Sequence, residues 1–141
     1  MIYIIDFGSQ VTQLIARRVR EQGVYCEIIS HKNAYNVISK SNTKGIILSG
    51  GPASVHVSNT PNLDKRVYKL GIPILGICYG MQLLVSQLGG KVSISSKREF
   101  GRTQIKTNYK NLLFGSLKQK NKKSFIVWMS HGDKVVKLPN G

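Results

Sequence analysis

Short apolar runs alternate along the chain with segments in which apolar residues recur every three or four positions. Four runs stand out, and the last two contain glycines toward their ends: IYIIDF at 2–7, VYCEII at 24–29, GIILSGG at 45–51 and IPILGIC at 72–78. Because a strand that is covered on both faces is apolar throughout, these runs predict strands of a parallel sheet.

The segment between the first two runs predicts an amphipathic helix over residues 9–23. Ser9 is a suitable N-cap, and Gly23 is a suitable residue to end the helix. The apolar side chains expected on its inner face are Val11, Leu14, Ile15 and Val19.

Two further helices are predicted around the fourth run. One covers residues 60–71, with Thr60 as its cap, Pro61 at its first position and Gly71 at its end. The other covers residues 79–90. Its expected inner face consists of Met81, Leu84, Val85 and Leu88.

The last third of the chain predicts three more strands, at 91–95, 102–107 and 124–131. Alternation of strands and helices at this spacing indicates an α/β fold with a mostly parallel sheet and helices on both faces. Binding and catalytic sites of such sheets lie at the carboxyl ends of the strands. The glycine-containing ends of the third and fourth runs are therefore the first places to look for chemistry.

Length and composition fit one globular domain. The chain has 141 residues, 41% of them hydrophobic, and no apolar stretch approaches the ~18 residues of a membrane span. No signal-peptide pattern opens it, and its two cysteines, Cys26 and Cys78, are expected to be reduced in a cytoplasm. Cys26 lies within a predicted strand and is expected to be a small core residue.

The charge is strongly positive. There are 21 Lys and Arg residues against 6 Asp and Glu, a formal net charge of +15. Such an excess favours nucleic acid or an acidic partner, but the basic residues are scattered. The densest run, at 117–125, has no interleaved aromatic residues and predicts a solvated loop. We therefore expect no membrane or nucleic-acid partner, although nucleic-acid binding stays a third hypothesis, recognisable by salt-dependent association without a role for Cys78.

The fourth run ends in GICYG, in which Cys78 lies between Gly76 and Gly80. This spacing on a strand-to-helix turn is typical of a nucleophile elbow. The helix that follows directs its positive end at the sulfur and favours the thiolate, and the N–H of Tyr79 is placed to stabilise an oxyanion. A tight turn with a buried thiol is the simpler interpretation, but SGGPAS at 49–54 offers a second glycine-rich loop at a neighbouring strand end.

Several segments together resemble the GMP synthase branch of the class I glutamine amidotransferases: DFGSQ, LSGGPASV, GIPILGICYGMQLL, LGGKV, KREFGR and WMSHGD. The resemblance runs from Ile2 to about Asp133 and implies a flavodoxin-like sheet. It implies that Cys78 attacks the side-chain amide of glutamine, forms a glutamyl thioester and releases ammonia. The other implied site residues are Gly51 and Tyr79 in the oxyanion hole, and Gln82, Ser130, His131, Gly132 and Asp133 around glutamine, the last four largely through backbone.

The resemblance also implies a partner. In the family, ammonia passes to a synthetase domain that uses ATP and Mg²⁺ to aminate XMP to GMP. We expect no metal or cofactor in residues 1–141, no synthetase domain there, and a synthetase that is either fused or a separate subunit. Self-association is expected as well, because an incomplete domain leaves a sheet edge and part of its core uncovered.

One family motif is missing from the 141 residues. Class I enzymes carry a His-x-Glu pair after the SHGD segment, and none follows Asp133 here. We therefore expect an amidotransferase domain that is incomplete at its C-terminus, weakly stable, and inactive or very weak alone. Of the histidines present, His31 is expected in a surface loop and His56 at the rim, whereas His131 with Asp133 imitates the missing pair.

A cysteine-dependent stress, redox or binding module is the alternative, because such proteins use the same elbow on the same kind of sheet. This alternative and the glutaminase hypothesis differ in the labelling that they predict for Cys78. A glutamine-mimicking electrophile should label Cys78 rather than Cys26, and glutamine should protect Cys78 only if the site binds glutamine.

Overall fold

The computed structural model describes residues 1–106 and 124–140, without the side chains of residues 95–100 and 131. Most of the basic run at 117–125 therefore lies outside the described residues. The chain forms two compact units: Met1–Ser95 with Asp133–Gly141, and Ser96–Gly132. Among the described residues, no helix has the length and apolar character needed to cross a membrane.

The first unit contains the predicted parallel sheet. Its strands are β1 (Ile2–Asp6), β2 (Cys26–Ser30), β3 (Gly45–Leu48) and β4 (Ile74–Gly76). They lie in the order β2-β1-β3-β4, and every neighbouring pair is parallel. All carboxyl ends therefore meet at one edge, where the glycine-rich segments after β3 and β4 follow.

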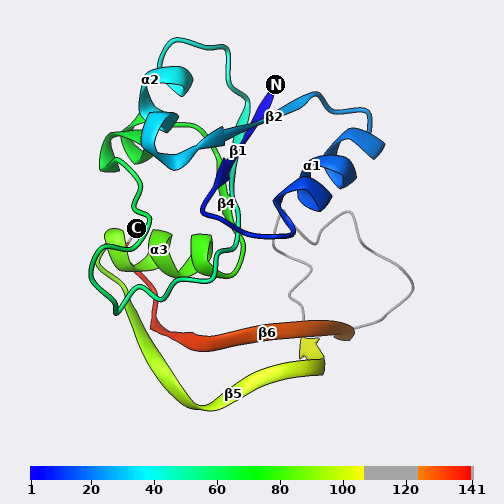
Figure 1. Ribbon diagram of the computed structural model, residues 1–141, viewed down its shortest axis with the longest axis vertical. Helices are drawn as coiled ribbons and strands as arrows, with labels where there is room; N and C mark the ends of the chain where they lie inside the picture. Colours follow the sequence, from blue (N-terminus) through cyan, green and yellow to red (C-terminus); the bar gives the residue numbers. More distant parts are fainter. Residues whose placement is uncertain (107–123, 141) are drawn as a thin grey trace. The chain divides into compact units, whose positions relative to one another are not determined.

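Helices cover both faces of this sheet, as predicted (Figure 1). On one face lies α1 (Thr12–Glu21), which packs on a small cluster of Ile4, Ala16, Cys26 and Ile47. The elements that contribute to the other face are α2 (Ala34–Ile38), the 3₁₀ helix η2 (Lys65–Leu70) and α3 (Tyr79–Gln87), with the 3₁₀ helix η1 (His31–Asn33) leading into α2.

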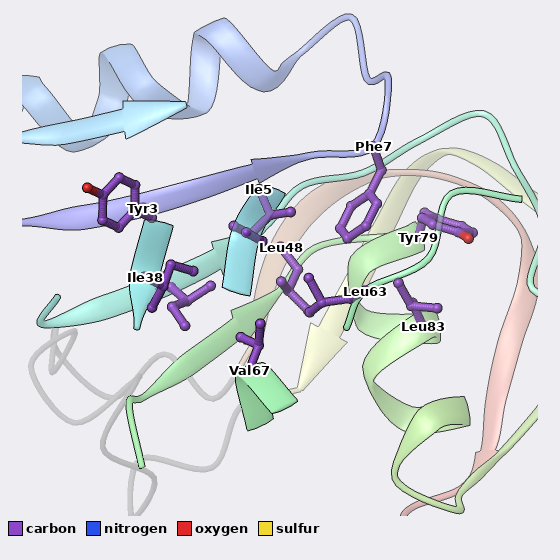
Figure 2. Packing of buried hydrophobic residues seen from close by; sticks show 11 residues of the cluster. Tyr3, Ile5, Phe7, Ile38, Leu48, Leu63, Val67, Tyr79 and Leu83 are labelled. Carbon is purple, nitrogen blue, oxygen red and sulfur yellow. The ribbon is translucent and has the colours of Figure 1, made fainter. Parts of the chain in front are cut away.

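The larger core cluster lies under α2, η2 and α3 (Figure 2). Phe7, just after β1, and Tyr79, the first residue of α3, meet edge to face with ring centroids 5.5 Å apart. Leu63 and Leu83 are buried in the same cluster. The start of α3 is therefore fixed by aromatic packing to the end of β1.

Shortening the fully buried Ile4 to valine is expected to lower the free energy of unfolding by about 1 kcal/mol, because a methyl-sized void is left beneath α1. In the protein made from its intact gene, thermal denaturation should show a melting temperature about 3 °C lower.

The matched control is Ile94→Val, since Ile94 is 71% exposed. It should leave the melting temperature unchanged within error. Equal shifts for the two variants would contradict the assigned core.

The expected start and inner face of α1 were partly wrong. The helix begins at Thr12 with Val11 as its cap residue, while the Ser9 hydroxyl only accepts a hydrogen bond from the Val11 amide at 3.2 Å. Val11 and Leu14 are exposed, and Thr12 and Ala16 are buried instead. The small Ala16 lets the helix approach the sheet so closely that the Cys26 Sγ lies 3.4 Å from its carbonyl oxygen.

The helix predicted over 60–71 is also shorter than expected. Only η2 forms, capped by Asp64, and Gly71 ends it with φ of +68° as predicted. The pKa of the Asp64 carboxyl is lowered, mainly by the hydrogen bond from the Arg66 side chain and next by the one from the Arg66 backbone N–H. Thr60 and Pro61 stay outside, because this stretch is held by α3: the Tyr79 hydroxyl donates to the Pro61 carbonyl.

The inner face predicted for the 79–90 helix was wrong at two of its four positions. Met81 and Leu88 are exposed and Leu84 is only partly buried, whereas Val85 is buried as expected. The side chains that enter the core cluster are those of Tyr79 and Leu83. Apolar side chains occur on both sides of this helix, at Tyr79 and Leu83 as well as at the four predicted positions, so its sequence period does not select a single face.

The remaining strands form a separate two-stranded sheet of β5 (Lys91–Lys106) and β6 (Ser124–Lys137), which run in opposite directions (Figure 1). The strands predicted at 91–95 and 102–107 are confirmed as strand up to residue 106, but the break between them was wrong, because β5 is continuous through KREFGR. Gly101, with φ of +107°, lies within it and allows the strand to continue through an unusual backbone angle.

Candidate active site

Cys78 has the backbone of a nucleophile elbow. It lies between β4 and α3 with φ of +49° and ψ of −115°, and it is the cap residue at the N-terminus of α3. Among the described non-glycine residues, only Cys78 and Asn59 have positive φ. Such a conformation costs of order 1–3 kcal/mol and persists only where the surrounding structure enforces it.

Gly76 and Gly80 make this turn possible, because their lack of a side chain allows close contacts between backbone segments. A Cβ atom on Gly76 would lie 2.6 Å from the Cα of Met81, and one on Gly80 would lie 2.5 Å from the carbonyl oxygen of Leu48. The Gly80 amide also lies 3.0 Å from the Ser49 carbonyl oxygen, which ties the first turn of α3 to the end of β3. The glycine spacing seen in the sequence is therefore a steric requirement of the elbow.

The SGGPAS loop after β3 lies against the elbow. A Cβ atom on Gly50 would be 3.5 Å from the Cβ of Cys78, and one on Gly51 would be 3.5 Å from the ring of Tyr79. Within the described part of the chain, the backbone N–H groups of Gly51 and Tyr79 donate to no partner. The role of both amides in an oxyanion hole stays a prediction.

The two thiols differ in access. Cys78 is exposed and Cys26 is buried, which confirms Cys26 as a core residue. Iodoacetamide is therefore expected to alkylate Cys78 in the folded protein while Cys26 reacts only after denaturation, as peptide mass spectrometry can measure. Modification of both thiols at similar rates without denaturant would contradict this arrangement.

Gln82 and Asp133 meet beside the elbow, within the first unit. Gln82, 4% exposed, donates from Nε2 to the Asp133 carbonyl oxygen at 3.1 Å. The hydroxyl of Ser54 donates to Asp133 Oδ2 at 2.6 Å. In the sequence, Ser54 stands out only as the last residue of SGGPAS, so the role of its side chain was missed.

The other predicted residues are less completely placed. Ser130, His131 and Gly132 belong to β6 in the second unit, and the side chain of His131 is outside the described residues. Their contacts with glutamine, and the imitation of the missing acid–base pair by His131, stay predictions.

The two remaining histidines lie in the first unit. His31 was expected in a surface loop, but it is half-buried in η1, stacks on Phe7 and lies 3.2 Å from the Asp6 carbonyl oxygen. His56 is exposed, and its amide donates to Ser54 Oγ at 3.2 Å. The Asp6 carbonyl and the Phe7 ring hold His31 beside the end of β1.

A cavity of about 480 Å³ lies between the loop at 55–62 and the later turns of α3. Its lining includes Leu83, Ser86 and Gln87, but none of the residues predicted for the site.

Comparison with known proteins yields one consistent family. The sequence model described as glutamine amidotransferase class-I matches residues 3–141. Proteins named glutamine-hydrolysing GMP synthase are 51% identical in Aquifex aeolicus and 54% identical in Rhodopseudomonas palustris, over 99% of this chain. The chain spans 27% and 26% of the length of these two relatives.

Solved structures agree with the sequence comparison. A protein from Thermoplasma acidophilum described as a GMP synthase subunit has a TM-score of 0.74 and 31% identity, over 99% of this chain and 68% of its own. A glutamine amido transferase from Methylobacillus flagellatus, at 16% identity, has a TM-score of 0.65, over 100% of this chain and 58% of its own, and supports the fold alone.

Proposed function

The chain belongs to the class-I glutamine amidotransferase family, and from that premise we propose that it is the glutaminase part of a GMP synthase. The observation that carries the proposal is the strained, exposed Cys78 at the N-terminus of α3. Near 50% identity to proteins named GMP synthase supports the choice of that branch.

The reaction follows from the elbow. The Cys78 thiolate bonds to the side-chain amide carbon of glutamine, and the carbonyl oxygen becomes an oxyanion that accepts from the N–H groups of Gly51 and Tyr79. When the carbonyl re-forms, the C–N bond breaks, and the nitrogen takes up a proton equivalent to the one that the thiol lost and leaves as ammonia. Water then cleaves the thioester, which releases glutamate and restores the thiol.

The ammonia then serves a synthetase that aminates XMP to GMP with ATP and Mg²⁺. The greater length of the bacterial relatives supports a fused synthetase, and the Thermoplasma acidophilum protein, described as one subunit of a GMP synthase, supports a separate one. No residue of this chain is assigned to ATP or Mg²⁺. A cytoplasmic location is part of the same proposal.

Two assays test the proposal, on the protein made from its intact gene and on residues 1–141 alone. The intact protein should release ammonia from glutamine, and 6-diazo-5-oxo-L-norleucine should label Cys78 but not Cys26. Glutamine should slow that labelling.

A redox or stress-sensing thiol predicts a different pattern, with no ammonia release and no protection of Cys78 by glutamine. That result would reject the proposal. Activity of residues 1–141 alone would instead make His131 and Asp133 the candidates for the acid–base pair.

A further inference from the structure

Building on the glutaminase proposed above, we propose that Ser54 is a positioning residue. Through Asp133, it holds the SGGPAS loop at 49–54, which contains Gly51, to α3. The structure offers three linked contacts for this role, all within the first unit.

The first contact is the hydrogen bond from the Ser54 hydroxyl to the Asp133 carboxylate. Its length of 2.6 Å is in the range of a charge-assisted O–H···O⁻ bond, and it joins residues 79 positions apart. Both side chains are half-buried. A bond of this kind is stronger than one between neutral groups and is partly shielded from water.

The second contact orients the hydroxyl. The His56 amide donates to Ser54 Oγ at 3.2 Å, so one lone pair of that oxygen is occupied from the backbone side. The hydroxyl hydrogen is then free to point at Asp133. The Ser54 hydroxyl is thereby oriented by its own loop as well as by Asp133.

The third contact reaches the nucleophile. The side chain of Gln82 donates from Nε2 to the Asp133 carbonyl oxygen at 3.1 Å. The backbone N–H of Gln82 donates to the Cys78 carbonyl oxygen at 3.0 Å. Asp133 therefore holds the first turn of α3 on one side and Ser54 on the other.

Ser54 follows Gly51 by three positions, so the restraint on Ser54 limits how far the Gly51 amide can move from the elbow. An oxyanion donor acts by being in place before charge develops, and misplacement by 1 Å can cost about 100-fold in rate.

The test uses Ser54→Ala in the protein made from its intact gene. The kcat for ammonia release from glutamine should fall about 10- to 100-fold while KM changes by less than about threefold, because the oxyanion is stabilised only in the transition state. Ser54→Thr keeps the hydroxyl and should recover most of the kcat. Ser58→Ala, on an exposed serine of the same loop, is the matched control and should match the parent.

Two labelling rates separate positioning from general damage. Inactivation by 6-diazo-5-oxo-L-norleucine, which depends on the position of the oxyanion donors beside its carbonyl group, should slow in Ser54→Ala. Alkylation of Cys78 by iodoacetamide, which needs only an accessible thiol, should keep the parent rate. In an Asp133→Ala background, Ser54→Ala should add no further loss.

Three results would overturn the inference: a Ser54→Ala kcat within twofold of the parent, a Ser54→Thr variant as slow as Ser54→Ala, or full additivity with Asp133→Ala. Each requires a parent that hydrolyses glutamine. A parent without that activity would reject the proposed function itself, and the two failures are therefore distinguishable.

Discussion

Replacement of Cys78 by serine is expected to lower glutamine-dependent ammonia release by roughly 10⁴-fold or more. A serine hydroxyl at this turn is a far weaker nucleophile than a thiolate, so the covalent intermediate does not form at a useful rate. Ammonia release from glutamine in the protein made from its intact gene measures the loss. If that protein includes or binds a synthetase, GMP formation from added ammonia should continue, because that reaction bypasses Cys78.

The matched control is Cys26→Ala. Cys26 is fully buried beneath α1, so its loss should lower stability modestly and leave kcat unchanged. Activity that survives in Cys78→Ser but is lost in Cys26→Ala would reverse the assignment of the two thiols.

Gly80→Ala is expected to destabilise the fold by about 3 kcal/mol or more. The added Cβ would lie 2.5 Å from the Leu48 carbonyl oxygen and 2.6 Å from that of Ser49, and both are backbone atoms that cannot rotate away. Relief requires α3 to shift from the end of β3, which also displaces Cys78. Because small domains are stable by only about 5–15 kcal/mol, soluble yield and melting temperature should both fall.

Gly71→Ala is the control for the loss of glycine itself. Gly71 has φ of +68°, and a Cβ atom added there would have no atom within 4 Å, so alanine should cost only about 1 kcal/mol of backbone strain. Similar losses for the two variants, measured by thermal denaturation, would mean that the contact between α3 and β3 is looser than the distances indicate.

The sequence was sufficient to predict the sheet and the elbow, because both depend on local patterns. Continuous apolar runs identified β1 to β4, and glycines two positions either side of Cys78 identified the turn. Where two backbone segments lie in close contact only glycine fits, so such contacts can be recognised in the sequence.

The helix over 60–71 was mispredicted because its local signals are overruled by contacts from α3. The Tyr79 hydroxyl holds the Pro61 carbonyl, and Gln87 Nε2 donates to the Leu63 carbonyl at 2.9 Å. These carbonyl oxygens are therefore engaged with α3, and Thr60 and Pro61 stay outside η2. Neither partner is near in the sequence, so no window of local residues reveals them.

Ser54 escaped prediction for the same reason. Its hydroxyl is paired with a carboxylate 79 residues away, and serine after a glycine-rich turn is ordinarily a turn residue. Only the three-dimensional contact distinguishes the two roles.

The place of β4 in the sheet has a consequence for the stability of the turn at Cys78. Among the described residues β4 pairs only with β3, and Leu75 at its centre is 40% exposed. A strand with one bonded edge opens more readily than its neighbours, so the strained turn at Cys78 is coupled to a local opening equilibrium. Pairing of a further strand with the second edge of β4 is expected to shift that equilibrium toward the closed turn by mass action.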